Sequence, residues 1–457
     1  MEKMNVCLIN DSFPPVIDGV SNAVFNYAQI LQKNHANVIV ATPDFPGVKD
    51  DYDFEVLRYP SIDTTKAVGY RTGIPFNANY LSQFNERNID IIHSHCPITS
   101  TFLARIIREQ THKPIIMTYH TKFDIDIRRS IDSKLLQDVA INALVANISA
   151  VDEVWAVSRG AGENLKSLGY QGDYIVMHNG VDFTKGASRS ELKTSLRKQY
   201  DLSKDKPTYL FVGRLMWYKG IKIIIDALKQ LKQHDQDFQM IFVGDGIEAD
   251  QIKEYVKQCG LTDNCLFTGS IADRKLLKTF FSISDLFLFP STFDTNGIVV
   301  REAAAAGLGS VLIKGSCAAE DTADGVNVIQ IDENADSLAE VLIKAGNNMD
   351  YFHRIGKAAQ QQLYLSWDEA VEKAYERYKI VMEKYQYNSS KNVTLSDSFF
   401  GMWSDISLSV SKAKETRQRF VSRLLETTED IRKTGELISY RRTEIQEYLN
   451  DVMDRYL

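Results

Sequence analysis

The sequence contains few cysteines, and no two of them form a short metal-binding or redox motif. The five, Cys7, Cys96, Cys259, Cys265 and Cys317, are scattered along 457 residues without a C-x-x-C pair. This scatter is typical of reduced thiols and argues against a disulfide framework or a cysteine-based zinc site. We therefore expect a cytoplasmic protein whose thiols are free.

Long apolar runs and an excess of positive charge are also lacking. No stretch approaches the roughly 18 apolar residues of a membrane-spanning helix, and no apolar segment typical of a signal peptide is evident. Lys and Arg number 53 against 60 Asp and Glu, which gives a net charge of −7. This balance disfavours a nucleic-acid partner, whose phosphates need neutralising. Peripheral attachment to the inner face of the cell membrane stays open.

What is present has the composition of an ordinary globular protein, with 44% hydrophobic and 25% charged residues. Short β-branched runs alternate with segments of helical length, and several runs are almost continuously apolar. That pattern indicates strands covered on both faces of a parallel sheet. The predicted strands span residues 5–10, 37–41, 54–59, 89–95, 114–120, 153–157, 174–178, 209–212, 240–243, 265–267, 286–289, 310–313 and 326–331.

The alternation stops at a polar stretch, 186–207, and then restarts, which divides the chain into two halves. We predict an α/β protein with two tandem Rossmann-like, doubly wound domains and a cleft between them. Ligands of such domains bind beyond the carboxyl ends of the strands. The predicted parts are a first domain at 1–185, a linker at 186–206, a second domain at 207–366, a closing helix at 367–387 and a tail at 388–457.

The tail differs from the rest because it carries no strand pattern. Leu424, Ile431, Ile438, Ile445 and Val452 recur every seven residues and would form one stripe of an amphipathic helix. Basic residues flank the stripe, so it suits an anionic membrane surface. Docking on the protein itself, or pairing with a second copy into a homo-oligomer, fits equally well, and these alternatives stay open.

The loop after the first predicted strand is the first candidate site. It reads Asn10-Asp-Ser-Phe-Pro-Pro-Val-Ile-Asp-Gly-Val-Ser, with Gly19 at the start of a predicted helix. A glycine there lets backbone N–H groups approach an anion, which the helix dipole also favours. The alternative, that the prolines and Gly19 only shape a loop, carries equal weight.

The second candidate follows the strand at 209–212 and reads Gly213-Arg-Leu-Met-Trp-Tyr-Lys-Gly. Arg214 and Lys219 leave the strand end and enter a helix, which places a planar fork of donors and a point charge where they suit a diphosphate. The alternative is a pair of solvated surface charges. The position at the carboxyl end of a strand favours function.

The third candidate follows the strand at 286–289 and reads Asp294-Thr-Asn-Gly-Ile-Val-Val-Arg-Glu. Gly297 permits a tight turn into the helix that carries Glu302. The carboxylates of Asp294 and Glu302 are able to accept hydrogen bonds from sugar or ribose hydroxyls. Acids that merely complement a helix dipole would explain the pattern equally well.

Histidines form the fourth group, since His93 and His95 end one predicted strand and His120 ends the next. His120 would face the same cleft as the other candidates. A metal site needs three convergent ligands and a satisfied second shell, which the sequence does not indicate. Strand-end histidines are more often structural than catalytic, so position alone leaves His120 undecided.

Two further patterns are weaker. Gly244-Asp-Gly-Ile-Glu-Ala matches the dinucleotide fingerprint, but the next strand ends without the acid that holds the ribose, so a nicotinamide site is disfavoured. Asp124-Ile-Asp126 is a D-x-D triple of the kind that holds a metal-bound nucleotide-sugar in another fold. With 60 acids in the chain, such triples arise by chance.

Taken together, these motifs resemble the retaining glycosyltransferases of family 4, which have the GT-B fold. The resemblance covers residues 4–385, and its pieces occur in the order and spacing of that family. The pieces are Asp18-Gly-Val, Tyr119-His-Thr, His178-Asn-Gly-Val-Asp182, Gly213-Arg-Leu, Lys219-Gly, Gly244-Asp-Gly, and Asp294 to Glu302-Ala.

The sequence departs from the family pattern at two positions. Asp294 stands where the family usually has Glu, and Asp18 stands where a second glycine usually precedes Gly19. Two local patterns, Phe13-Pro-Pro-Val-Ile-Asp-Gly-Val-Ser and Ser291-Thr-Phe-Asp-Thr-Asn-Gly, are similar to bacterial diacylglycerol glucosyltransferases. The Lys-x-Gly-Gly loop of glycogen and starch synthases is absent.

The resemblance implies an enzyme that transfers a hexose to the hydroxyl group of a lipid. The favoured donor is UDP-glucose, and the favoured acceptor is diacylglycerol. Other acceptors are the alternative: a phosphoinositide, a glycan or a polysaccharide precursor. The non-enzymatic alternative is a scaffold that binds a nucleotide-sugar without catalysing transfer. Retention is implied through a same-face displacement in which the leaving diphosphate takes the acceptor's proton.

The resemblance also assigns the site residues. Fixed cations would stabilise the leaving group, so neither a metal nor another cofactor is expected. The residues implied to be catalytic are His120, Arg214, Lys219 and Glu302. Those implied to bind the donor are Gly19, Gly213, Arg214, Lys219, Gly244, Asp294, Asn296, Gly297 and Glu302.

Overall fold

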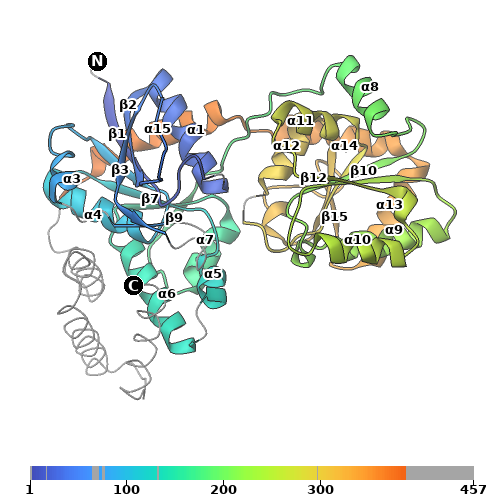
Figure 1. Ribbon diagram of the computed structural model, residues 1–457, viewed down its shortest axis with the longest axis horizontal. Helices are drawn as coiled ribbons and strands as arrows, with labels where there is room; N and C mark the ends of the chain where they lie inside the picture. The colour runs from blue at the N-terminus through green and yellow to red at the C-terminus, as the bar shows by residue number, and fades with distance from the viewer. Residues whose placement is uncertain are drawn as a thin grey trace. The chain divides into compact units, whose positions relative to one another are not determined.

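The chain forms two compact units, each with its own sheet (Figure 1). The computed structural model describes residues 3–16, 18–63, 71–74, 78–130, 133–295 and 297–387. The first unit contains Met1–Ala156, Gly162–Val176 and the chain from Lys373, and the second contains Val157–Ala161 and Met177–Glu372. Within the described ranges, no helix combines the length and apolar character needed to cross a bilayer.

The first unit is built on a seven-stranded sheet with the order β3-β2-β1-β6-β7-β8-β9, in which every pair is parallel. All residues of β6 and β7 are buried, as their apolar runs predict. The strands are β1 (Met4–Ile9), β2 (Ala36–Pro43), β3 (Glu55–Tyr59), β6 (Ile91–Ser94), β7 (Ile115–Tyr119), β8 (Glu153–Ala156) and β9 (Tyr174–Val176), and a separate antiparallel pair joins β4 (Ser61–Ile62) to β5 (Thr72–Gly73). The helices of this half of the chain are α1 (Gly19–Asn34), α3 (Ala78–Ser82), α4 (Thr99–Thr111), α5 (Phe123–Ser130), α6 (Lys134–Ser149) and α7 (Arg159–Ser167).

The second unit is built on a six-stranded parallel sheet with the order β12-β11-β10-β13-β14-β15. Figure 1 shows α11, α12 and α14 on one side of this sheet and α9, α10 and α13 on the other. The strands are β10 (Thr208–Val212), β11 (Gln239–Val243), β12 (Cys265–Gly269), β13 (Leu286–Phe289), β14 (Gly309–Ile313) and β15 (Ile329–Ile331). The helices are α8 (Ser190–Gln199), α9 (Ile221–Gln233), α10 (Ala249–Gln258), α11 (Arg274–Ile283), α12 (Ile298–Ala306), α13 (Ala335–Asn347), α14 (Met349–Gln362) and α15 (Trp367–Lys384), and short 3₁₀ turns lie at η1 (Trp217–Lys219), η2 (Thr262–Asn264) and η3 (Cys317–Ala319).

Both sheets contain one point at which the strand order reverses. In the first sheet β1 lies between β2 and β6, and in the second β10 lies between β11 and β13. The loops beyond the two central strands diverge at such a point and leave room for a ligand at the carboxyl edge. The predicted doubly wound architecture is therefore confirmed, and it directs attention to the loops after β1, β6, β10 and β13.

Three features go beyond the sequence prediction. Helix α8 lies inside 186–206, the segment expected to be a linker, and packs against α11. From Lys373 onward, helix α15 belongs to the first unit.

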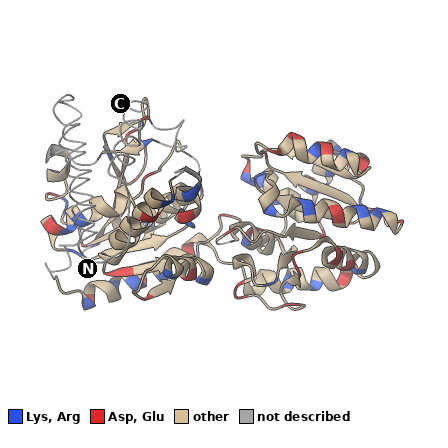
Figure 2. Ribbon diagram, turned by 90° about the horizontal axis from the view of Figure 1, so that it is seen from below, with Lys and Arg blue, Asp and Glu red and all other residues tan. Residues whose placement is uncertain are grey.

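Basic and acidic residues are interspersed over the helices of each unit (Figure 2). The predicted amphipathic tail, 388–457, lies outside the described residues.

Candidate active site

The loops after β10 and β11 are joined by glycine-mediated backbone contacts. The Gly213 N–H donates to the Val243 carbonyl at 3.0 Å, and the Leu215 N–H donates to the Asp245 carbonyl at 3.0 Å. Gly244 has φ of +136°, and a Cβ there would overlap the carbonyl oxygen of Gly213. The Gly-Asp-Gly pattern therefore brings two strand-end loops together.

Lys219 and Asp294, which come from two separate motifs, form a direct ion pair. Lys219 ends η1 after β10 and is only 7% exposed, whereas Asp294 lies in the loop after β13. The Ser291 hydroxyl donates to the second carboxylate oxygen of Asp294 at 2.6 Å. A buried ammonium needs such a partner, so the pair explains how Lys219 is tolerated at this edge.

Arg214 lies on the same loop as Lys219 but in a different environment. Its side chain is exposed, and no described residue forms a hydrogen bond or an ion pair with it. The guanidinium therefore offers its fork of donors to other groups at the carboxyl edge of the second sheet. Of the two predicted cations, Arg214 keeps an uncompensated charge and Lys219 does not.

Glu302 is held by an arginine that the sequence motifs did not indicate. It lies in α12 with 5% exposure and pairs with Arg274, the first residue of α11. Arg274 also pairs with Asp182, with Nε 2.8 Å from Oδ2, and its guanidinium lies 4.4 Å from the centre of the Phe183 ring. Burial raises the pKa of Glu302, and the positive charge of Arg274 opposes this rise. Because Arg274 follows β12 at a helix start, the rule that selected Arg214 would also have found it.

Gly297 begins helix α12 in the left-handed region, with φ of +54°. A Cβ there would lie 3.1 Å from the Cβ of Ala318, so glycine suits both the backbone and the space. Asn296, also predicted to bind the donor, lies outside the described residues. This turn brings Glu302 to the edge that carries Asp294.

In the first unit, the loop after β1 leads into an already capped helix. The Asp18 carboxylate accepts hydrogen bonds from the N–H groups of Val20 at 2.8 Å and Ser21 at 2.7 Å. Open space surrounds the position of a Cβ on Gly19. The chain's own carboxylate thus occupies part of the anion-binding end of α1, and an anion near Gly19 would meet that negative charge.

The three histidines predicted at strand ends lie together and are buried. His120 Nε2 lies 2.9 Å from His95 Nδ1, and the ring centres of His93 and His95 are 4.0 Å apart. Burial lowers the pKa of His120 to about 3, and it also depresses the pKa values of His93 and His95. All three imidazoles are therefore neutral near pH 7.

The D-x-D triple lies in helix α5 rather than at a strand end. Asp124 accepts a hydrogen bond from the Asn164 amide at 3.2 Å and lies 3.9 Å from Arg128. The side chain of Asp126 lies outside the description. The surroundings of Asp124 thus indicate a structural role for it.

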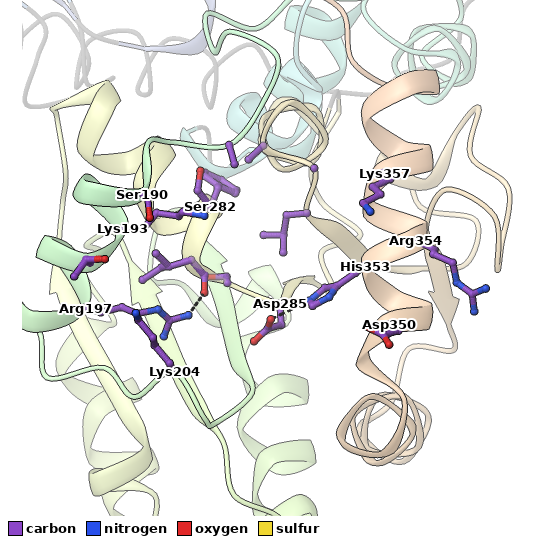
Figure 3. A pocket seen from close by; sticks show the side chains of 18 of the residues that line it. Ser190, Lys193, Arg197, Lys204, Ser282, Asp285, Asp350, His353, Arg354 and Lys357 are labelled. Carbon is purple, nitrogen blue, oxygen red and sulfur yellow. Dashed lines mark hydrogen bonds and ion pairs between the residues drawn. The ribbon is translucent and has the colours of Figure 1, made fainter.

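A hollow of about 1150 Å³ lies elsewhere on the second unit (Figure 3). Its lining includes Asp285, directly before β13, and Leu308, directly before β14. His353 Nε2 lies 3.0 Å from Asp285 Oδ1, and this hydrogen bond raises the pKa of His353. The hollow therefore opens at the amino-terminal edge of the sheet, opposite the loops that carry Arg214 and Lys219.

Comparison with known proteins agrees with this geometry. The model of "Glycosyltransferase Family 4" matches residues 17–185, and that of "Glycosyl transferases group 1" matches residues 193–362. The α-monoglucosyldiacylglycerol synthase of Streptococcus pneumoniae is 23% identical over 309 residues, which cover 66% of this chain and 70% of the relative. The GDP-mannose-dependent α-mannosyltransferase of Corynebacterium glutamicum is 26% identical over 343 residues, or 72% and 77% of the two chains.

Solved structures share the fold. Anabaena HepE, crystallised with UDP and glucose, aligns with a TM-score of 0.63 and 18% identity over 82% of this chain and all of its own. The two parallel Rossmann-like sheets in tandem form the GT-B fold that these structures share. The chain belongs to glycosyltransferase family 4.

Proposed function

We propose that the protein transfers glucose from UDP-glucose, with retention of configuration, to the hydroxyl group of diacylglycerol. The observation that carries the donor part is Arg214, an exposed guanidinium without a described partner at the switch point of the second sheet. A planar fork of N–H donors suits a diphosphate, and Lys219 adds a second cation on the same loop.

In the proposed reaction the bond between the sugar's anomeric carbon and the diphosphate breaks, and the acceptor oxygen bonds to that carbon on the same face. The acceptor's proton passes to the leaving diphosphate. Arg214 and Lys219 stabilise the negative charge that develops there, as preorganised donors do. Glu302 accepts hydrogen bonds from ribose or sugar hydroxyls, and His120 contacts the donor sugar.

Further roles follow for the loops. Gly213 and Gly244 let the two loop backbones approach the diphosphate, while Asp294, Asn296 and Gly297 bind the donor sugar. In this proposal the fixed cations perform the task of a metal ion, so none is required. Gly19 contributes backbone donors beside Asp18.

The lipid acceptor rests on two observations. The loop Phe13-Pro-Pro-Val-Ile-Asp-Gly-Val-Ser is similar to diacylglycerol glucosyltransferases, and a relative at 23% identity is a monoglucosyldiacylglycerol synthase. We further propose a cytoplasmic enzyme that contacts the inner face of the cell membrane through the tail at 388–457. Mannosyl transfer from GDP-mannose is the second candidate, because the Corynebacterium relative uses that donor.

The test is product analysis with a panel of donors and acceptors. UDP-glucose, UDP-galactose and GDP-mannose are each incubated with vesicles of diacylglycerol, with a phosphoinositide and with soluble glycans, in the presence and absence of EDTA. We expect an α-glucosyl lipid by mass spectrometry and NMR, formed equally well with EDTA. A mannosyl product would establish the second candidate, and neither transfer nor donor hydrolysis would indicate a binding scaffold.

The membrane contact has its own test. Deletion of 388–457 should leave donor hydrolysis intact and reduce transfer in anionic vesicles. Equal co-sedimentation of full-length and truncated protein with those vesicles would remove the tail from the proposal.

A further inference from the structure

In the row of buried histidines at the carboxyl edge of the first sheet, the described residues leave His95 Nε2 without a hydrogen-bond partner. Both nitrogens of His93 are engaged, Nδ1 with the Tyr378 hydroxyl at 2.6 Å and Nε2 with the Thr118 hydroxyl at 2.7 Å. His95 Nδ1 contacts His120 Nε2 at 2.9 Å. His95 Nε2 is buried, and no atom of the described residues forms a hydrogen bond with it. Because only one nitrogen of His95 has a partner among the described residues, the possible positions of the protons on His95 and His120 are restricted.

Two neutral imidazoles share the contact between His95 and His120, so one nitrogen donates and the other accepts. If His120 donated, His95 would carry its proton on Nε2, and a buried N–H group would have no acceptor. Orphaned buried N–H groups are rare because they cost the full desolvation penalty. If His95 donates, its buried Nε2 keeps a lone pair without a partner, which is the cheaper arrangement. His120 then carries its proton on Nδ1, and neither nitrogen of His120 is among the buried polar atoms that lack a partner.

We propose that His95 is a positioning residue that donates from Nδ1 to His120 Nε2 and thereby fixes the proton of His120 on Nδ1. His120 is then a neutral imidazole whose Nδ1 is always a donor. Its low pKa, caused by burial, keeps it in this form through the physiological range. His95 thus acts through His120, because the hydrogen bond at one ring nitrogen of a histidine fixes which nitrogen carries the proton.

This inference rests on the proposed function in one respect, namely that His120 contacts the donor sugar. An N–H group in a fixed position recognises a sugar oxygen and rejects a cation. It also makes the interaction independent of solvent pH near neutrality. The affinity for the sugar nucleotide should therefore depend on His95, whereas the affinity for UDP, which lacks the transferred hexose, should not.

The direct test is the tautomer itself. Two-bond ¹H–¹⁵N spectra of the full-length protein labelled with ¹⁵N-histidine distinguish Nδ1–H from Nε2–H, and His120→Gln assigns the His120 signals. We expect Nδ1–H for His120 in the wild-type protein. We expect this pattern to be lost in His95→Leu and kept in His95→Asn, whose amide nitrogen replaces Nδ1 as the donor. An Nε2–H form of His120 in the wild type, or an unchanged spectrum in His95→Leu, would overturn the proposal.

Kinetics provide the second measurement. His95→Leu should raise the KM for the sugar nucleotide about tenfold, the order expected for one lost hydrogen bond, with UDP affinity unchanged and His95→Asn largely rescued. Thr118→Val is the matched control, because it removes a buried hydrogen bond to His93 without touching His120. Its KM should stay within about twofold of wild type.

The two proposals fail differently. If the spectra are as expected but His120→Gln leaves the sugar-nucleotide KM unchanged, the role of His120 in donor binding is wrong and the positioning by His95 stands. If Thr118→Val and His95→Leu raise the KM equally, general destabilisation explains both, and positioning by His95 is wrong.

Discussion

Arg214 and Lys219 lie on one loop, yet their surroundings predict different consequences of removal. Arg214→Ala should lower kcat by at least about 100-fold, the order seen when a preorganised donor to a developing anion is removed. Its unfolding free energy should change by no more than about 0.5 kcal/mol, because the side chain is exposed and without a described partner. Steady-state kinetics and chemical denaturation measure both quantities. Near-wild-type turnover would remove Arg214 from the diphosphate site.

Lys219→Ala should lower both activity and stability. The motif alone predicts that Lys219 is a charge in the cleft whose removal leaves folding nearly unaffected, but the structure buries it against Asp294. Removing one member of a buried pair leaves the other charge uncompensated, and the partial exposure of Asp294 reduces that cost to roughly 1–3 kcal/mol. The double variant Lys219→Met with Asp294→Asn is the control and should regain stability but not activity. Equal stability of Lys219→Ala and wild type would contradict the buried pair.

The sequence predicted Arg214, Lys219, Asp294 and Glu302 because each stands shortly after an apolar strand, where α/β proteins place ligands. It did not predict that Lys219 pairs with Asp294, nor that Arg274 joins Glu302 to a distant carboxylate. Such contacts connect segments that are far apart in the chain, so no local spacing reveals them. Position was therefore predictable, whereas the state of each charge was not.

At the scale of the elements, a substitution at the start of helix α1 tests whether the N-terminus of this helix binds an anion. Asp18→Gly removes the capping carboxylate and restores the glycine that the family usually has there. If the diphosphate binds beside Gly19, the donor KM should fall about two- to fivefold, since a negative charge no longer competes for the helix dipole. Stability should change by only a few tenths of a kcal/mol, because glycine is tolerated at this position, whereas Asp18→Ala should cost about 1 kcal/mol. An unchanged KM in Asp18→Gly would exclude Gly19 from the donor site.

The strands were the most predictable elements, because continuous apolar runs bounded by polar turns have few other interpretations. The strand predicted at 326–331 begins only at Ile329. The Asn327 side chain accepts a hydrogen bond from the Ala323 N–H at 2.7 Å and holds a turn there instead. A side chain that bonds to nearby backbone competes with strand pairing, and an apolar pattern does not reveal this competition.

For the molecule as a whole, the buried histidines predict a loss of stability in mild acid. The unfolded chain binds protons at histidine near pH 6.5, whereas folded His120, with a pKa of about 3, stays neutral. The unfolded state therefore binds more protons below pH 6.5, and stability falls as the pH drops from about 7 toward 3. His120 alone accounts for about 2 kcal/mol at pH 5.

Denaturation midpoints at pH 7.5 and pH 5 check this prediction. Glu302, whose pKa burial raises, acts in the opposite direction, so the comparison with His120→Gln isolates the histidine contribution. The variant should lose less stability than wild type between these two values. An equal loss in both proteins would show that the pKa of His120 is the same in the folded and the unfolded chain, which would contradict its burial.

A substitution of Tyr378 in helix α15 should destabilise the first unit and leave the second unit intact. Tyr378 belongs to the first unit, stacks on Trp155 with ring centres 5.6 Å apart, and contacts His93. Tyr378→Ala should destabilise the first unit by about 3–5 kcal/mol, and Tyr378→Phe, which keeps the ring, by about 1–2 kcal/mol. Hydrogen exchange should show lost protection in β6 and β8 and intact protection in β10 and β11. Uniform loss across both sheets would mean that the units unfold together.

Because helix α15 lies late in the chain, its position also affects how the first unit folds during translation. His93 and Trp155 are synthesised more than two hundred residues before Tyr378, and the whole second unit is made in between. The nascent first unit therefore lacks one of its buried aromatic residues, while the second can complete its sheet as soon as it emerges. Since an incomplete core exposes apolar surface, the early part of the chain is the part for which a chaperone would matter during translation.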